Sequence, residues 1–87
     1  MPTIRLVIHG RVQGVFFRDS MRMEAQQQGI TGWVRNHRDG KVEAVVQGKE
    51  ASVQHMLRWA QHGPKLAQVE KVDVTPDDGT YLTFDIL

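Results

Sequence analysis

The amino-acid sequence predicts an α+β sandwich in which two helices cover one face of an antiparallel sheet of four main strands, with a short strand added at the C-terminus. Short segments alternate between apolar and polar residues, which is typical of strands. Two longer segments repeat apolar residues every three or four positions, which is typical of helices. The resulting order, strand-helix-strand-strand-helix-strand, is the ferredoxin-like βαββαβ arrangement.

The first strand is predicted at residues 4–8, where every second residue is a large aliphatic one. The first helix is predicted at residues 19–28, because apolar residues recur there at four-residue spacing. Gly29 follows as the glycine that ends this helix.

A hairpin is predicted next, with strands at residues 30–36 and 41–47 joined through Asp39-Gly40. A two-residue loop would divide the apolar side chains of the pair between both faces. A three-residue loop at 38–40, with its glycine left-handed, pairs Asn36 with Val42 and gathers the apolar side chains on one face. The second register is favoured, because mixed faces would lose the burial of a whole strand.

The rest of the chain supplies a second helix and two more strands. The helix is predicted at residues 51–61 and ends before Gly63-Pro64. A fourth strand is predicted at residues 69–74, with a phase break at Glu70-Lys71 that indicates a bulge. After a turn rich in aspartate, apolar residues alternate again in a last strand at residues 82–86.

Composition narrows the class of protein. Residues 1–87 are expected to form a single domain. The formal net charge of +1 favours neither a nucleic-acid nor a membrane partner, and no apolar run approaches a membrane span. The chain has no cysteine, and its N-terminus lacks a signal-peptide core. A cytoplasmic protein is therefore expected.

The segment Gly10–Arg18, between the first strand and the first helix, has the features of an anion site. Its two glycines allow the backbone to turn toward a ligand. The N–H groups at the start of the helix point at the loop, and the helix dipole favours negative charge there. Arg18 adds a planar guanidinium that can bind two oxygens of a phosphate or carboxylate.

The topology brings Asn36 to the same place. The first two strands run in the same direction, so their C-terminal ends lie at one edge of the sheet. The loop that contains Arg18 leaves the first of these ends, and Asn36 lies at the second, facing the helices. Arg18 and Asn36 are therefore expected to share one pocket.

The chain resembles the acylphosphatases. The resemblance rests on two segments, Gly10-Arg11-Val12-Gln13-Gly14-Val15-Phe16-Phe17-Arg18 and Gly32-Trp33-Val34-Arg35-Asn36-His37-Arg38-Asp39-Gly40-Lys41-Val42-Glu43. It continues to Phe84-Asp85-Ile86 and so covers nearly the whole chain. The residue after the arginine is often aromatic in this family. Here it is Asp19, whose negative charge bears on the affinity for an anion.

The resemblance implies hydrolysis of acyl phosphates to a carboxylate and inorganic phosphate, without a metal or cofactor. It implies that Arg18 binds the phosphate and that Asn36 holds the attacking water. The expected partners are a small acyl phosphate and inorganic phosphate, as product and inhibitor, with the protein a monomer.

This chemistry needs few catalytic groups. The carboxylate of a mixed anhydride departs without a general acid, so positioning and electrostatic stabilisation supply most of the catalysis. The Asn36 amide can both donate to and accept from one water, and the phosphate itself is hypothesised to take the proton of that water. The residues expected to bind the phosphoryl oxygens through backbone N–H groups are Gln13, Gly14, Val15, Phe16, Phe17 and Arg18.

Other residues are expected to have structural roles or none. The four histidines show no i,i+4 spacing, so no metal site is predicted. His37, beside Asn36, could add positive potential. Phe16 and Phe17 could clamp the acyl group or pack, and Phe17 is expected in the core. Trp33 is expected on the open face of the sheet, in a cluster with two valines.

Two other functions are the rivals of hydrolysis for a chain with this order of elements. RNA-recognition domains share this strand order, but they stack bases on aromatic residues of the two central strands. Residues 4–9 and 41–47 contain no aromatic residue, which argues against nucleic-acid binding. The second rival is a non-catalytic module that binds an anion or a partner with the same loop. Asn36 distinguishes the two, because a module that only binds needs no amide to orient water.

Overall fold

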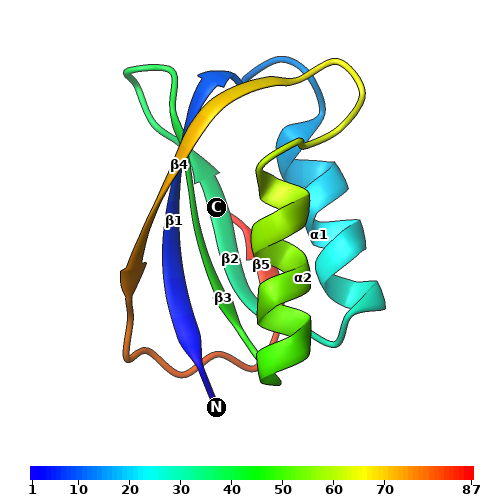
Figure 1. The fold of residues 1–87 in the computed structure, drawn as a ribbon, viewed down its shortest axis with the longest axis vertical. Helices are drawn as coiled ribbons and strands as arrows, with labels where there is room; N and C mark the ends of the chain where they lie inside the picture. The colour runs from blue at the N-terminus through cyan, green and yellow to red at the C-terminus, as the bar shows by residue number, and fades with distance from the viewer.

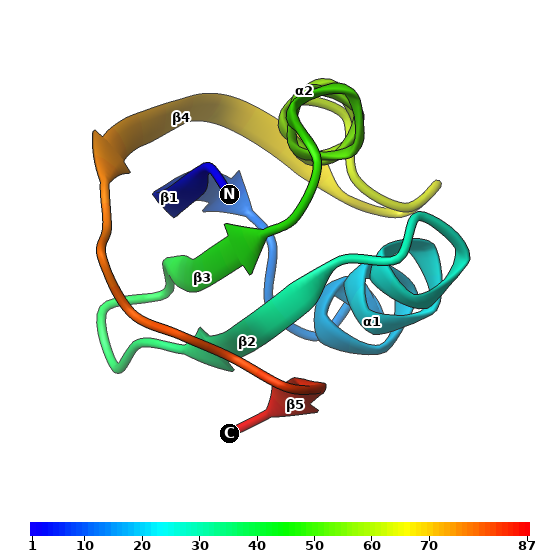
Figure 2. The same ribbon diagram turned by 90° about the horizontal axis from the view of Figure 1, so that it is seen from below.

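The computed structural model describes residues 1–87 and confirms the α+β sandwich. Its five-stranded sheet has the strand order β4-β1-β3-β2-β5. Figures 1 and 2 show both helices on the same face of this sheet. The elements are β1 (Thr3–Arg11), α1 (Phe17–Gln27), β2 (Thr31–Asn36), β3 (Val42–Gln47), α2 (Glu50–Ala60), β4 (Gln68–Pro76) and β5 (Phe84–Ile86).

The β2–β3 hairpin has the predicted register. Asn36 lies opposite Val42 across the ladder. The N–H of His37 donates to the carbonyl of Lys41 at 2.8 Å, and Gly40 has φ = 97°. The three-residue loop and its left-handed glycine are confirmed. Because β1 and β2 both run antiparallel to β3, their C-terminal ends lie at the same edge of the sheet, as predicted.

The first strand is longer than predicted. β1 runs on to Arg11, so Gly10 and Arg11 belong to the strand rather than to the loop. Their pairing with β4 explains the difference. Gly10 has φ = +126°, and a Cβ there would lie 2.2 Å from the carbonyl oxygen of Gln68. The β1–β4 register shifts beside Gly10 and leaves Glu70 unpaired, which confirms the bulge predicted from the phase break.

The starts of β5 and of α1 also differ from prediction. β5 begins at Phe84 rather than at residue 82, and the Leu82 side chain is 92% exposed. β5 pairs with β2 in parallel, so the complete sheet is mixed and only its four main strands are antiparallel. At the other boundary, α1 begins at Phe17, which leaves residues 12–16 as the loop.

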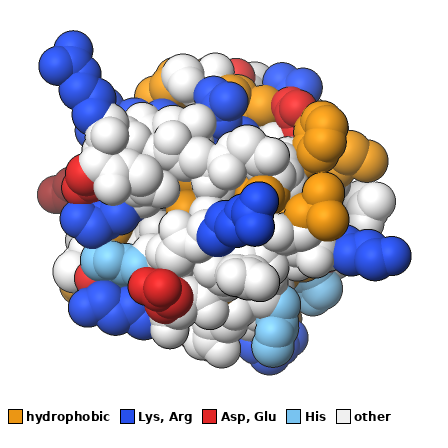
Figure 3. Space-filling view, turned by 90° about the horizontal axis from the view of Figure 1, so that it is seen from above, with side chains coloured by type: hydrophobic (Ala, Val, Ile, Leu, Met, Phe, Trp, Pro, Cys, Tyr) orange, Lys and Arg blue, Asp and Glu red, His pale blue; other side chains and the backbone are white.

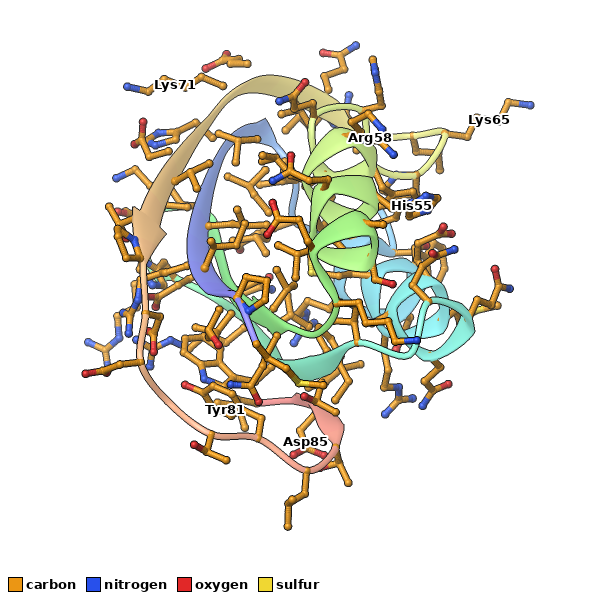
Figure 4. The ribbon with its side chains drawn as sticks, turned by 60° about the horizontal axis from the view of Figure 1, so that its bottom comes forward. His55, Arg58, Lys65, Lys71, Tyr81 and Asp85 are labelled. Atoms are coloured by element: carbon orange, nitrogen blue, oxygen red, sulfur yellow. The ribbon has the colours of Figure 1, made fainter.

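A single apolar core lies between the helices and the sheet. Phe17 is 2% exposed, as expected, and its ring meets Trp59 edge-on with 5.4 Å between centroids. The helices also contact each other through a hydrogen bond between Glu24 of α1 and His55 of α2, and Figure 4 labels the second of these residues. Neither helix is long and apolar enough to cross a membrane. The core holds the start of α1 firmly against the end of the sheet.

Candidate active site

The loop between β1 and α1 is curved by two residues with positive φ. Gly14 has φ = 73° and Phe16 has φ = 63°. Left-handed residues that alternate with ordinary ones point successive N–H groups to the same side of the backbone, and such concave loops bind anions. No backbone hydrogen bond outside the helices and strands is donated by residues 13–16. Their N–H groups are therefore available to a ligand.

Phe16 is the residue at which the loop becomes the helix. It is the N-cap of α1, and its carbonyl accepts the N–H of Ser20 at 3.0 Å. A left-handed conformation is unusual for an aromatic residue. Its side chain is 72% exposed, so the strain is not explained by packing in the core. Strain of this kind is often found at functional sites.

Arg18 lies in the first turn of α1 and is half-buried at the cavity. None of the ion pairs of the chain includes it. Its guanidinium is therefore free to bind an anion, beside the positive end of the helix dipole. The buried ring of the preceding Phe17 fixes this turn to the core.

Asn36 reaches the same cavity from the end of β2. Its Oδ1 atom is buried and has no hydrogen-bond partner. Buried polar atoms of native proteins nearly always have a partner, so an exception indicates a group prepared for a ligand or a water molecule. The cavity has a volume of about 340 Å³, enough for a small molecule. Its lining residues are Val12, Gln13, Gly14, Phe16, Phe17, Arg18, Asp19, Asn36 and Ile86.

The structure thus places nearly all the predicted site residues around one cavity. Val15 is the exception, because its side chain is 4% exposed and packs in the core beneath the loop. Two of the lining residues were not predicted from the sequence. Val12 follows the unforeseen extension of β1, and Ile86 comes from β5, whose pairing beside β2 gave no signal in the sequence.

The side chain of Gln13 was also missed. Its Nε2 donates to the carbonyl of His37 at 2.6 Å and to that of Lys41 at 3.0 Å. From the sequence, only the backbone N–H of Gln13 is expected at the site. No local pattern predicts which backbone carbonyls a glutamine side chain will reach across the fold.

On the opposite face of the sheet, an ionic network surrounds Glu43. This carboxylate is 4% exposed. It accepts hydrogen bonds from Arg5 at 2.6 Å, Arg35 at 2.8 Å and His37 at 2.7 Å. Burial alone would raise the pKa of Glu43, but the hydrogen bonds of His37 and Arg35 and the nearby arginine charges lower it below its ordinary value. The network holds the residues on either side of Asn36.

The network also determines where two side chains of the open face lie. His37 points to Glu43 rather than into the cavity, so its side chain does not line the site. Trp33 pairs with Val45, as expected. Its ring also lies between two guanidinium groups, with its centroid 5.9 Å from Cζ of Arg5 and 5.4 Å from Cζ of Arg35. Cation–π contacts of this kind are attractive.

The end of the molecule that carries the loop and the hairpin is rich in positive charge. Figure 3 looks onto this end and shows Lys and Arg side chains around its rim, with fewer Asp and Glu side chains. A positive rim attracts anionic ligands toward the cavity. No group of three or more His, Cys, Asp or Glu side chains is arranged to hold a metal ion.

Comparison with known proteins gives a consistent result. The family described as Acylphosphatase matches residues 4–86. A curated acylphosphatase of Thiobacillus denitrificans is 54% identical over 85 residues, covering 98% of this chain and 96% of the relative. One of Albidiferax ferrireducens is 50% identical over 84 residues, covering 97% and 91%. The crystal structure of acylphosphatase from Bacillus subtilis superposes with a TM-score of 0.95 at 34% identity, covering 100% of this chain and 99% of that one.

Proposed function

The chain belongs to the acylphosphatase family and hydrolyses acyl phosphates, and we propose that it does so with the backbone of residues 13–18, the Arg18 guanidinium and the Asn36 amide. The observation that carries this assignment of roles is the convergence of free donors and one buried, unpartnered amide oxygen on a single cavity. No feature of the fold or of the relatives favours the alternative of a module that only binds.

The first proposed role is to bind the phosphoryl group. The N–H groups of residues 13–16 have no backbone acceptor, and the first N–H groups of α1 lack intrahelical partners. Together with Arg18 they can surround the phosphoryl oxygens. In a loose transition state negative charge is spread over these oxygens, so fixed donors in a partly dehydrated cavity stabilise it. Asp19 lines the same cavity, and its carboxylate is expected to weaken rather than abolish anion binding.

The second proposed role is to orient the attacking water. The Oδ1 atom of Asn36 accepts one hydrogen bond from the water, and the amide NH₂ donates one to it. Two contacts fix the direction from which the water oxygen approaches phosphorus. A bond forms between the water oxygen and phosphorus as the P–O bond to the carboxylate breaks, and one proton of the water passes to a phosphoryl oxygen. The products are a carboxylate and inorganic phosphate.

The proposal also covers inorganic phosphate as a ligand, the oligomeric state of the protein and its location in the cell. Inorganic phosphate is proposed to bind in the loop both as the product and as a competitive inhibitor. Residues 1–87 are proposed to act as a single monomeric domain in the cytoplasm, where a chain without cysteine is at no disadvantage. Activity is expected to survive treatment with EDTA, because no step above uses a metal.

The test compares three alanine variants in the release of phosphate from a simple acyl phosphate. Arg18→Ala is expected to lower kcat/KM by roughly 100- to 1,000-fold and to abolish inhibition by phosphate. Asn36→Ala should lower kcat while phosphate still binds. Arg22→Ala, one turn further along α1 and exposed, is the matched control and should resemble the wild type.

Circular dichroism establishes that each variant is folded. Retained phosphate affinity in a folded Arg18→Ala protein would contradict the role of Arg18. An equal loss of phosphate affinity and turnover in Asn36→Ala would contradict the role of Asn36 as a residue that acts on water.

A further inference from the structure

The side chain of Gln13 joins the two halves of the site. Its single Nε2 atom donates to two carbonyls, those of His37 at 2.6 Å and Lys41 at 3.0 Å. These two residues close the β2–β3 hairpin, because the His37 N–H donates to the Lys41 carbonyl. A residue of the phosphate-binding loop therefore holds the end of the hairpin directly.

Asn36 is the residue immediately before this closing pair. The ladder opposite Val42 constrains it on one side, and the carbonyl of the next residue, His37, is held by Gln13 on the other. On the opposite face of the sheet, Glu43 accepts hydrogen bonds from the side chains of both neighbours of Asn36. Of these contacts, the Gln13 bridge is the one that comes from the phosphate-binding loop.

We propose that Gln13 is a positioning residue, whose side-chain amide sets the separation between the phosphate-binding loop and the amide of Asn36. This inference rests on the proposed role of Asn36. Both protons of the Gln13 NH₂ group are directed at carbonyls, so the side chain holds the hairpin while the backbone N–H of the same residue remains free for phosphate.

The physical reason is that in-line attack depends on small distances. The water must lie close to phosphorus and opposite the leaving oxygen, and a displacement of about 1 Å can cost about 100-fold in rate. Without the bridge, no hydrogen bond joins the loop to the end of the hairpin, and the two are connected only through the sheet and the apolar core. The donors that bind phosphate all belong to the loop and to α1, and none belongs to the hairpin. Removing the bridge should therefore lower kcat and leave the affinity for phosphate unchanged.

The chain contains a matched control. Gln47 makes the same kind of bridge at the far end of β3, where its Nε2 donates to Thr3 Oγ1 and to the Gly79 carbonyl, both at 2.7 Å. Gln13→Met and Gln47→Met each remove an Nε2 bridge and keep the length of the side chain, and Gln47→Met also removes the hydrogen bond that Gln47 Oε1 accepts from the Tyr81 N–H at 3.1 Å. Gln13→Met should lower kcat for acetyl phosphate by roughly 10- to 100-fold, with the inhibition constant of inorganic phosphate changed by less than about twofold. Gln47→Met should leave both quantities close to the wild type.

A double-mutant cycle with Asn36→Ala tests the route of the effect. If Gln13 acts through Asn36, then Gln13→Met should cost less than about twofold in kcat once Asn36 is alanine. If the losses of kcat in the two single variants multiply in the double variant, the inference is overturned. It is also overturned if Gln47→Met loses as much kcat as Gln13→Met. A phosphate inhibition constant that rises as much as kcat falls would also overturn it, because Gln13 would then act on phosphate binding.

Two further measurements distinguish a failure of this inference from a failure of the proposed role of Asn36 and from a defect in folding. Wild-type kcat in Asn36→Ala alone would overturn the proposed role of Asn36 and this inference with it, whereas the other contrary outcomes overturn the inference only. If Gln13→Met does not fold by circular dichroism, Gln13→Asn replaces it, because this variant keeps a polar amide that is too short to reach both carbonyls. A folded Gln13→Asn protein with wild-type kcat would overturn the inference.

Discussion

The two faces of β3 are buried by different means. On the helix side, Val42, Ala44 and Val46 are fully buried in the apolar core. On the open side no element covers the strand, yet Glu43 is 4% exposed and Val45 is fully buried. Arginine and tryptophan side chains from the neighbouring strands, and the His37 side chain from the end of the hairpin, lie over them. The central strand is therefore protected by hydrophobic packing on one face and by a network of charges on the other.

The two faces of β3 should respond differently to changes of pH and salt. Apolar burial is insensitive to protonation, whereas a network of carboxylates and cations loses strength when its members change charge. The arginines of the network are 41% and 49% exposed in their side chains, so water and salt weaken these contacts. The helix side should dominate stability at neutral pH, and the open side should govern how stability changes with pH.

The largest effect is expected from the helix side of β1. Leu6 is fully buried there, and Leu6→Ala should lower the free energy of unfolding by about 2–5 kcal/mol, because it removes buried methyl groups and leaves a cavity. Val7 is the next residue, points to the open face and is half-buried. Urea denaturation should show a clearly smaller loss for Val7→Ala, and equal losses would contradict the difference between the faces.

A smaller effect is expected from the centre of the open-face network. Glu43→Gln keeps the shape of the side chain but removes its charge, and should lower the free energy of unfolding by about 1–2 kcal/mol at neutral pH. The arginines are partly exposed and can regain water, which limits the loss. A urea midpoint indistinguishable from that of the wild type would show that the network adds no stability.

The smallest expected effect is on the dependence of stability on pH. The folded-state pKa of Glu43 lies below its ordinary value of 4.5, so its stabilising effect is present above that pH and is lost as the pH falls through the folded-state pKa. Hydrogen bonds from the Gly79 N–H and from Arg5 also lower the pKa of Asp77, so the wild type should lose stability in acid for more than one reason.

Urea denaturation between pH 7 and pH 3 can separate the contribution of Glu43. The difference in unfolding free energy between the wild type and Glu43→Gln should shrink below about pH 4.5, since a protonated glutamic acid resembles glutamine. A difference that stays constant over this range would contradict the role of the ionised carboxylate.

Features that depend on local patterns were predictable from the sequence. Side-chain parity and Gly40 predicted the hairpin register, since only one loop length keeps the apolar side chains of β2 and β3 together. The phase break in β4 predicted the bulge at Glu70. Because strand direction follows from the order of elements, the meeting of Arg18 and Asn36 at one end of the sheet was predictable as well.

Features that depend on long-range pairing were not predictable. Gly10 and Arg11 form a strand only because β4 lies beside them. Alternating residues predicted the last strand, but its start at Phe84 and its parallel pairing depend on contacts with β2. The bridge from Gln13 to the hairpin joins residues 24 and 28 positions apart, and a glutamine side chain carries no signal for such partners.

The position of β5 has a practical consequence for handling the protein. Ile86 forms part of the cavity wall, and the N–H of Leu87 donates to the Val34 carbonyl. An affinity tag fused after Leu87 would leave the molecule beside the cavity and could obstruct it. A tag fused before Met1 would leave from the opposite end of β1 (Figure 1), so amino-terminal fusions are the better choice for kinetic work and for immobilisation on a surface.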